Sequence, residues 1–193
     1  MSVAILKYNA GNVASVQNAL TRLGYESIVT DDAEEIMKAD KVIFPGVGEA
    51  SSAMEYLRVN KLDVVLKNLN QPVLGICLGM QLLCDYSEEG NTKCLGIFET
   101  TVKKFPPLDI VPQMGWNNLS NTKGELFKGI TDIDDVYFVH SYYAELCVNT
   151  FATCNYILPF SASLQKDNFY ATQFHPEKSG AVGEKILMNF LKL

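Results

Sequence analysis

The sequence predicts an α/β fold with a mostly parallel central sheet flanked by helices and with additional antiparallel strands in the C-terminal half. The first half of the chain alternates short apolar segments with segments of helical periodicity. Because parallel strands need a long crossover, usually a helix, this alternation is typical of a parallel sheet covered on both faces. Strand-like segments follow one another closely in the second half, where turns can join them as antiparallel pairs.

In the first half, strands are predicted where short apolar runs are bounded by polar or turn-forming residues. These strands cover residues 3–8, 27–30, 41–44 and 73–76. Helices are predicted from 13 to 23, from 31 or 32 to 38, within 51–68, and from 78 to 86, because apolar residues recur there every three or four positions. Gly24 ends the first helix, and Asp31 or Asp32 caps the second.

In the second half, strands are predicted at residues 96–105, 136–139, 152–157, 161–164 and 169–174, and a closing helix at 181–191. A turn at residues 166–168 should join the last two strands as a hairpin. Right-handed crossovers bring the C-terminal ends of the parallel strands to one edge of the sheet, where binding sites form. We therefore expect the functional residues at that edge.

Length and composition indicate a single soluble globular domain covering residues 1–193. Charged residues make up 20% of the chain and the net charge is −6, so no basic face for nucleic acid is expected. No apolar run reaches the roughly 18 residues of a membrane span, and the first residues do not look like a signal peptide. The five cysteines include no C-x-x-C pair, so we expect no disulfide framework, no metal site and a reducing cytoplasmic location.

Cys77 is the candidate nucleophile. It lies at a predicted strand-to-helix junction, in residues 75–81 (GICLGMQ), with glycines two positions before and two positions after it. This is the spacing of a nucleophile elbow, in which close backbone contacts leave room only for glycine. The helix start supplies free N–H groups that favour a thiolate and can bind an oxyanion. The alternative is that Cys77 is a small buried apolar residue, as we expect for Cys84, Cys147 and Cys154.

His175 is the candidate base, with Glu177 as the carboxylate that orients it. Residues i and i+2 of an extended chain point the same way, and Pro176 should keep the segment from coiling into a helix. A carboxylate on one imidazole nitrogen fixes the tautomer and stabilises the imidazolium. The alternatives are a purely structural His–Glu hydrogen bond, or His140 as the base. His140 also ends a strand but has no carboxylate within two residues, so we expect it to border the site.

Together these segments resemble the class I (triad) glutamine amidotransferases, over the whole chain. The family signatures are matched by residues 75–81, by residues 174–177 (FHPE) and by residues 45–48 (PGVG). The resemblance implies a flavodoxin-like fold and a triad of Cys77, His175 and Glu177. It also implies an oxyanion hole made by the N–H of Leu78 and one N–H from Gly46, Val47 or Gly48.

The resemblance further implies a glutamine-binding pocket. By family position, the residues that hold the substrate are Gly48, Gln81, Glu89, Ser141 and Tyr142. Two of them have ordinary alternatives, because Gln81 could be a solvent-facing helix residue and Glu89 could belong to a solvated turn.

Within the family, the chain looks most like the glutaminase subunits of histidine biosynthesis. Residues 8–12, 45–48, 114–117 and 140–143 carry this narrower resemblance, whereas Glu49 and Gln113 depart from it. It implies a heterodimer with a cyclase subunit of (β/α)₈-barrel fold that uses the ammonia, docked over Asn12, Trp116, Tyr137 and Lys178. Lys178 could instead be an ordinary solvated lysine. The chain has no phosphate-loop or nucleotide fingerprint of its own, and we expect no cofactor.

Two other functions fit parts of these data. The first is a cysteine peptidase or deglycase on the same fold, although such relatives typically lack the H-P-E segment. The second is a non-catalytic regulatory or scaffold subunit, although such a protein would be expected to lose Cys77, His175 or Glu177, and all three are present.

Overall fold

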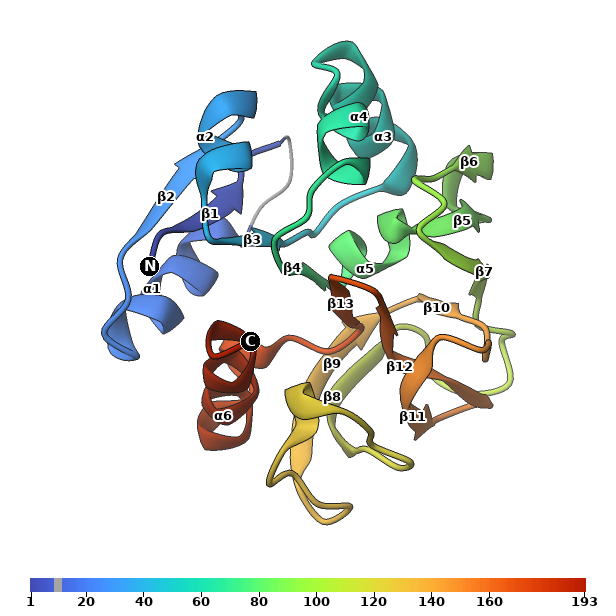
Figure 1. Ribbon diagram of the computed structural model, residues 1–193. Helices are drawn as coiled ribbons and strands as arrows, with labels where there is room; N and C mark the ends of the chain where they lie inside the picture. The colour runs from blue at the N-terminus through green and yellow to red at the C-terminus, as the bar shows by residue number, and fades with distance from the viewer. Residues whose placement is uncertain (9–11) are drawn as a thin grey trace.

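The computed structural model describes residues 1–8 and 12–193 (Figure 1). Part of the segment 8–12, which contributes to the narrower resemblance, therefore lies outside the described residues. None of the helices in the described part of the chain is long and apolar enough to cross a membrane.

The N-terminal half forms the parallel part of the sheet, as predicted. Its strands are β1 (Val3–Leu6), β2 (Ser27–Thr30), β3 (Lys41–Phe44) and β4 (Val73–Ile76), in the spatial order β2-β1-β3-β4. The C-terminal strand β13 (Phe169–Thr172) adds to β4, also in parallel. In Figure 1, β13 in dark red lies beside β4 in green, so segments far apart in the sequence become neighbours.

Helices cover both faces of this sheet. On one face lie α2 (Ala33–Lys38), α3 (Ala50–Val59), α4 (Leu62–Lys67) and α5 (Leu78–Leu83); on the other lie α1 (Val13–Arg22) and α6 (Gly180–Leu191). Successive side chains of each strand point to opposite faces and so contribute to two hydrophobic cores. Ala4 and Leu6 of β1 pack in the core under α2–α5, and Val3 and Ile5 pack in the core under α1 and α6.

Beyond β13 the sheet becomes mostly antiparallel and continues in the order β12-β10-β7-β5-β6, with β11 paired to β12. These strands are β5 (Cys84–Ser87), β6 (Thr92–Lys93), β7 (Phe98–Lys104), β10 (Tyr142–Ala144), β11 (Thr150–Asn155) and β12 (Pro159–Lys166). The predicted hairpin between β12 and β13 is present, with Asp167 in the left-handed region at its turn. A separate ribbon pairs β8 (Gln113–Asn118) with β9 (Asp135–His140). Short 3₁₀ turns occur at η1 (Glu89–Asn91), η2 (Glu125–Phe127) and η3 (Pro176–Lys178).

Three predicted elements are corrected by the structure. The helical segment 51–68 is two helices, because Lys61 takes the left-handed conformation between α3 and α4. The helix predicted from 78 to 86 ends at Leu83, because the next four residues form β5 and pair with β6 and β7. The first strand ends at Leu6 rather than at residue 8. In the second case long-range strand pairing overrides the local pattern.

Candidate active site

Cys77 occupies the turn between β4 and α5. Its backbone has φ 54° and ψ −108°, a conformation that a non-glycine residue rarely adopts. The amide of Cys77 donates to the carbonyl of Thr172 at 2.8 Å, so pairing with β13 continues into the turn. Although the side chain is only 7% exposed, it is placed at the C-terminal edge of the parallel strands, where the sequence predicted the functional residues.

The glycines on either side of Cys77 are required by packing. A Cβ on Gly79 would lie 1.9 Å from the carbonyl oxygen of Phe44 in β3. A Cβ on Gly75 would lie 2.7 Å from the Leu83 side chain and 3.0 Å from the backbone of Gly79. The close approach of α5 to β3 and β4 therefore depends on both residues, which is the crowding that the elbow spacing predicts.

His175 follows β13, and its Nδ1 lies 2.7 Å from Oε1 of Glu177. The segment is not extended as predicted, because Pro176–Lys178 forms the 3₁₀ turn η3. Pro176 stands at the first position of this turn, where a missing N–H costs nothing and a fixed φ suits helical geometry. The turn, and not strand alternation, brings the carboxylate of Glu177 back to the imidazole.

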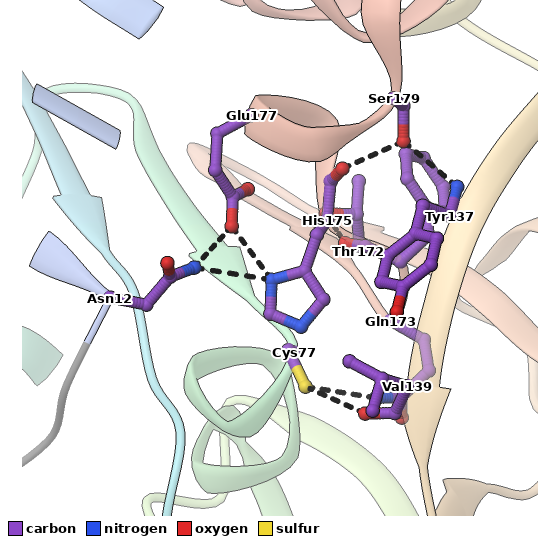
Figure 2. A network of polar contacts seen from close by, with 10 residues as sticks. Asn12, Cys77, Tyr137, Val139, Thr172, Gln173, His175, Glu177 and Ser179 are labelled. Atoms are coloured by element: carbon purple, nitrogen blue, oxygen red, sulfur yellow. Dashed lines mark hydrogen bonds and ion pairs between the residues drawn. The ribbon is translucent and has the colours of Figure 1, made fainter. Parts of the chain in front are cut away.

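The surroundings of His175 favour its protonated form. Burial of the ring lowers its pKa, but the nearby sulfur of Cys77 and the carboxylate of Glu177 outweigh burial and raise the pKa of His175 to about 10. Figure 2 shows the ring between Glu177 and Cys77. Nε2 is buried and has no hydrogen-bond partner among the residues that the structure describes, which leaves it available to a group beside the sulfur.

Asn12 lies against the same histidine and carboxylate. Its side-chain Nδ2 donates to Oε1 of Glu177 and lies 3.4 Å from Nδ1 of His175 (Figure 2). Because a carboxylate oxygen that accepts two hydrogen bonds is held more firmly than one that accepts a single bond, Asn12 helps to fix Glu177. The sequence suggested Asn12 only as a docking residue, and no local pattern links it to residues so far away in the chain.

The sulfur of Cys77 has two further polar neighbours. Nε2 of Gln173 lies 3.7 Å from it, and the carbonyl oxygen of Val139 lies 4.0 Å from it. Gln173 was missed by the sequence analysis, although it stands two positions before His175 at the end of the same strand. Alternation along the strand could have placed both side chains on the same side.

His140 is enclosed in a different network. Its Nδ1 lies 2.7 Å from the carbonyl of Tyr142 and its Nε2 lies 2.9 Å from the side-chain amide of Gln113. Burial lowers the pKa of His140 to about 4, so the ring is neutral near pH 7. Gln113 thus supplies the partner of one ring nitrogen, which explains what this departure from the subfamily pattern does here.

The PGVG segment lies directly beside the elbow. The amide of Leu78 donates to the carbonyl oxygen of Gly46 at 3.4 Å. The N–H group that the resemblance assigns to the oxyanion hole is therefore already hydrogen-bonded to this loop. Gly48 has φ 118°, which other residues rarely adopt, and Val47 is partly exposed between the two glycines. A Cβ on Gly46 would clash with the hydroxyl of Tyr8, which itself donates to the carbonyl of Pro45.

The residues assigned to a glutamine pocket come from separate segments of the chain, with Gly48 in the PGVG segment, Gln81 in α5 and Glu89 in η1. Gln81 is buried and donates through Nε2 to the carbonyl of Tyr142, which excludes the solvent-facing alternative. Glu89 is half-buried and accepts from the amide of Ala50, and burial raises its pKa. Ser141 connects β9 to β10 and Tyr142 begins β10, and both residues are partly exposed.

Exposed aromatic surface lies on the β8–β9 ribbon. Trp116 and Tyr137 are paired across the two strands, with ring centroids 6.0 Å apart. Trp116 is 57% exposed and the neighbouring Met114 is 66% exposed. Lys178 is also exposed, in the turn that carries Glu177. Exposed apolar side chains that lie together on one face are found at docking surfaces.

A family model described as glutamine amidotransferase class-I matches residues 4–193. Solved structures agree with the fold: one described as a glutamine amidotransferase has a TM-score of 0.76 at 18% identity, covering 98% of this chain and 97% of its own. A structure of PurLQS from Thermotoga maritima has a TM-score of 0.73 at 16% identity, covering 99% of this chain and 97% of its own. The chain therefore belongs to the class-I glutamine amidotransferase family.

Curated relatives show to which group within the family the chain is similar. A protein of Bacteroides fragilis is 60% identical over the full length of both chains, and one of Escherichia coli K12 is 48% identical, also over the full length of both. Both relatives are named imidazole glycerol phosphate synthase subunit HisH. The narrower resemblance predicted from the sequence is thereby confirmed.

Proposed function

We propose that this protein is the glutaminase subunit of an imidazole glycerol phosphate synthase. In this role it hydrolyses L-glutamine to glutamate and ammonia and passes the ammonia to a cyclase subunit in histidine biosynthesis. One observation carries the proposal: a chain similar over its full length to HisH proteins places a cysteine, a histidine and a glutamate together at the edge of its sheet.

In the first half-reaction, the thiolate of Cys77 attacks the carboxamide carbon of glutamine. The N–H of Leu78, with an N–H from the segment 46–48, stabilises the oxyanion of the tetrahedral intermediate. Protonated His175 then gives its proton to the departing nitrogen, so ammonia leaves and a glutamyl thioester remains. The pKa of about 10 supports this step, because it keeps His175 protonated at neutral pH while the thiolate is present.

In the second half-reaction, water hydrolyses the thioester. Having lost its proton to ammonia, neutral His175 removes a proton from the attacking water, and the thiolate of Cys77 leaves as glutamate forms. Glu177 keeps the imidazole in the tautomer and orientation that direct Nε2 toward the sulfur.

Glutamine itself would be held next to the elbow. We assign this role to Gly48, Gln81, Glu89, Ser141 and Tyr142. The carboxylate of Glu89 suits the α-ammonium of the substrate. The NH₂ of Gln81 already has two internal acceptors, so its Oε1 remains for the substrate.

The hydrogen bond from Leu78 to Gly46 suggests that the oxyanion hole is regulated. Rotation of the peptide groups around Val47 would remove the Gly46 carbonyl from the Leu78 amide and supply a second N–H in its place. The adjacent glycines make this rotation inexpensive. A partner that binds only the rotated form would activate the glutaminase.

The partner in this proposal is a cyclase subunit of (β/α)₈-barrel fold that forms a heterodimer with this chain. The names of the relatives as subunits support a partner, and the exposed face that carries Trp116, Tyr137 and Lys178 supports its position. Asn12 lies near the same face and contacts Glu177, which would connect docking with the catalytic residues.

Glutamate release from glutamine tests the proposal most directly. The chain in complex with its co-purified partner should release glutamate, whereas Cys77→Ser should fold normally and release none above background. A diazo-oxo-norleucine electrophile should label Cys77 in the parent protein, and Cys147→Ser serves as the control that keeps both labelling and turnover. Labelling at Cys84 or Cys147, or near-normal turnover of Cys77→Ser, would contradict the assignment.

A further inference from the structure

An amide group other than those of the oxyanion hole contacts the nucleophile. Gln173 is fully buried just after β13, and its Nε2 lies 3.7 Å from Sγ of Cys77 (Figure 2). N–H···S hydrogen bonds are longer than those to oxygen, and this distance lies within their range. The sulfur therefore has a neutral donor beside it, in addition to the charged His175.

The orientation of this amide is fixed by a chain of hydrogen bonds that starts at a backbone carbonyl. The carbonyl of Tyr142 can only accept, so the Gln81 atom 2.9 Å from it must be the NH₂ group. The same NH₂ lies 3.0 Å from Oε1 of Gln173. With its oxygen committed to Gln81, Gln173 must present its NH₂ to the sulfur.

We propose that Gln173 is a catalytic residue that donates a hydrogen bond to the sulfur of Cys77, and that Gln81 is a positioning residue that acts through Gln173. The bond stabilises the anionic sulfur and holds it in place for attack. The role in turnover rests on the proposed glutaminase function; the contact with the sulfur does not.

The titratable groups around the sulfur are distinct from Gln173. His175 lies beside it after the end of β13, with Glu177 behind. Tyr8, after β1, is buried and near enough for the charge of Cys77 to add to burial in raising the tyrosine pKa. Gln173 carries no charge at any pH. Replacing it therefore removes one donor and leaves the charged groups unchanged, so the effect on the sulfur can be measured separately.

The test is the pH dependence of Cys77 alkylation by iodoacetamide, followed by peptide mass spectrometry on the full chain. Gln173→Met keeps the side-chain volume but has no hydrogen-bond donor. In this variant we expect the pH midpoint of Cys77 alkylation to rise by about one unit, and the alkylation rate at pH values below that midpoint to fall about tenfold. Gln81→Met should shift the midpoint in the same direction by less. Gln71→Met is the matched control, because it removes a side-chain hydrogen bond to the carbonyl of Ile36 in α2, at the opposite end of β4 from Cys77, and should leave the midpoint unchanged.

In the complex with the partner, Gln173→Met should lower kcat for glutamate release about tenfold with less than a twofold change in KM. A parental alkylation midpoint in Gln173→Met overturns the proposal, as does an equal shift in Gln71→Met. If Gln173→Met does not fold by circular dichroism, a parental midpoint in Gln81→Met overturns it instead. Alkylation needs no glutamine hydrolysis, so a parent protein that releases no glutamate defeats the proposed function and leaves this test intact.

Discussion

His140 is the last residue of β9 and His175 follows the end of β13, but their neighbours shift the pKa values of the two rings in opposite directions. His175 lies between a sulfur and a carboxylate and is protonated at neutral pH. His140 lies among aromatic rings, has no carboxylate partner in the described part of the chain, and is neutral near pH 7. A base that must exchange a proton with substrate needs a free nitrogen, and only the Nε2 of His175 provides one in the described structure.

Substitution of the two histidines should therefore separate their roles. We expect His175→Asn to lower turnover by about 10³-fold, because both half-reactions use its proton. Glu177→Gln should cost less, since Glu177 only orients and stabilises the imidazolium. Steady-state glutamate release with the partner present measures both variants and His140→Asn. If His140→Asn proved more damaging than His175→Asn, the two roles would be reversed.

Buried His140 should also make stability depend on pH. The unfolded chain binds the proton near the ordinary pKa of 6.5, whereas folded His140 binds it only at about 4. Between these values the unfolded state holds more protons, so this contribution to stability is lost as pH falls. When the pH is lowered from about 7 to about 5.5, the free energy of unfolding should fall by about 1 kcal/mol more in the parent than in His140→Gln.

Urea unfolding of the two proteins at both pH values provides the measurement. His175 acts in the opposite direction, because its raised pKa gives a contribution that is greatest below 6.5 and is lost as pH rises toward about 10. That contribution is common to both proteins and cancels in their difference. Equal pH dependence in the two proteins would show that His140 is not buried as a neutral group.

Spacing in the sequence was sufficient to select Cys77, His175 and Glu177 as candidates, because each belongs to a short segment with its own geometric pattern, and the structure brings the three side chains together. It could not locate the contact of Asn12 with Glu177, since these residues meet only when α1 packs against η3. The role of the 3₁₀ turn was also missed, because Pro176 was taken to oppose helical geometry when it instead begins a turn of that kind.

At the scale of elements, the elbow depends on how closely α5 approaches β3. The space that Gly79 leaves is already filled by the backbone carbonyl of Phe44, which cannot move without disturbing the sheet. We expect Gly79→Ala to destabilise the protein by about 3 kcal/mol, measured as the free energy of unfolding in urea. An unfolding midpoint equal to that of the parent would show that α5 does not pack as described.

Strands β3 and β4 could be predicted to the residue, because apolar four-residue segments buried on both faces have few alternatives. The end of α5 and the strand β8 could not. Residues 84–87 continue an apolar pattern but pair with β7, and β8 carries alternating polar and exposed apolar residues that only its partner β9 makes into a strand. Pairing at long range, rather than local preference, decides both cases.

At the scale of the whole molecule, the blocked Leu78 amide predicts weak activity of the isolated subunit. We expect the partner with its substrate bound to accelerate glutamate release at least roughly a hundredfold, a differential stabilisation of about 3 kcal/mol. Steady-state rates of the subunit alone, with the cyclase, and with cyclase plus ligand provide the measurement. Full activity of the lone subunit, unchanged in the other two conditions, would remove the switch and weaken the subunit assignment.

The parallel pairing of β4 with β13 has a consequence for the nascent chain during translation. Cys77 leaves the ribosome long before its partners His175 and Glu177 have been translated, and the strand that carries them inserts between β4 and β12. Until that insertion, the thiol has neither an imidazolium beside it nor a neighbouring strand to hold its backbone. Chemistry at Cys77 that depends on His175 and Glu177 therefore requires the last strand of the sheet to be in place.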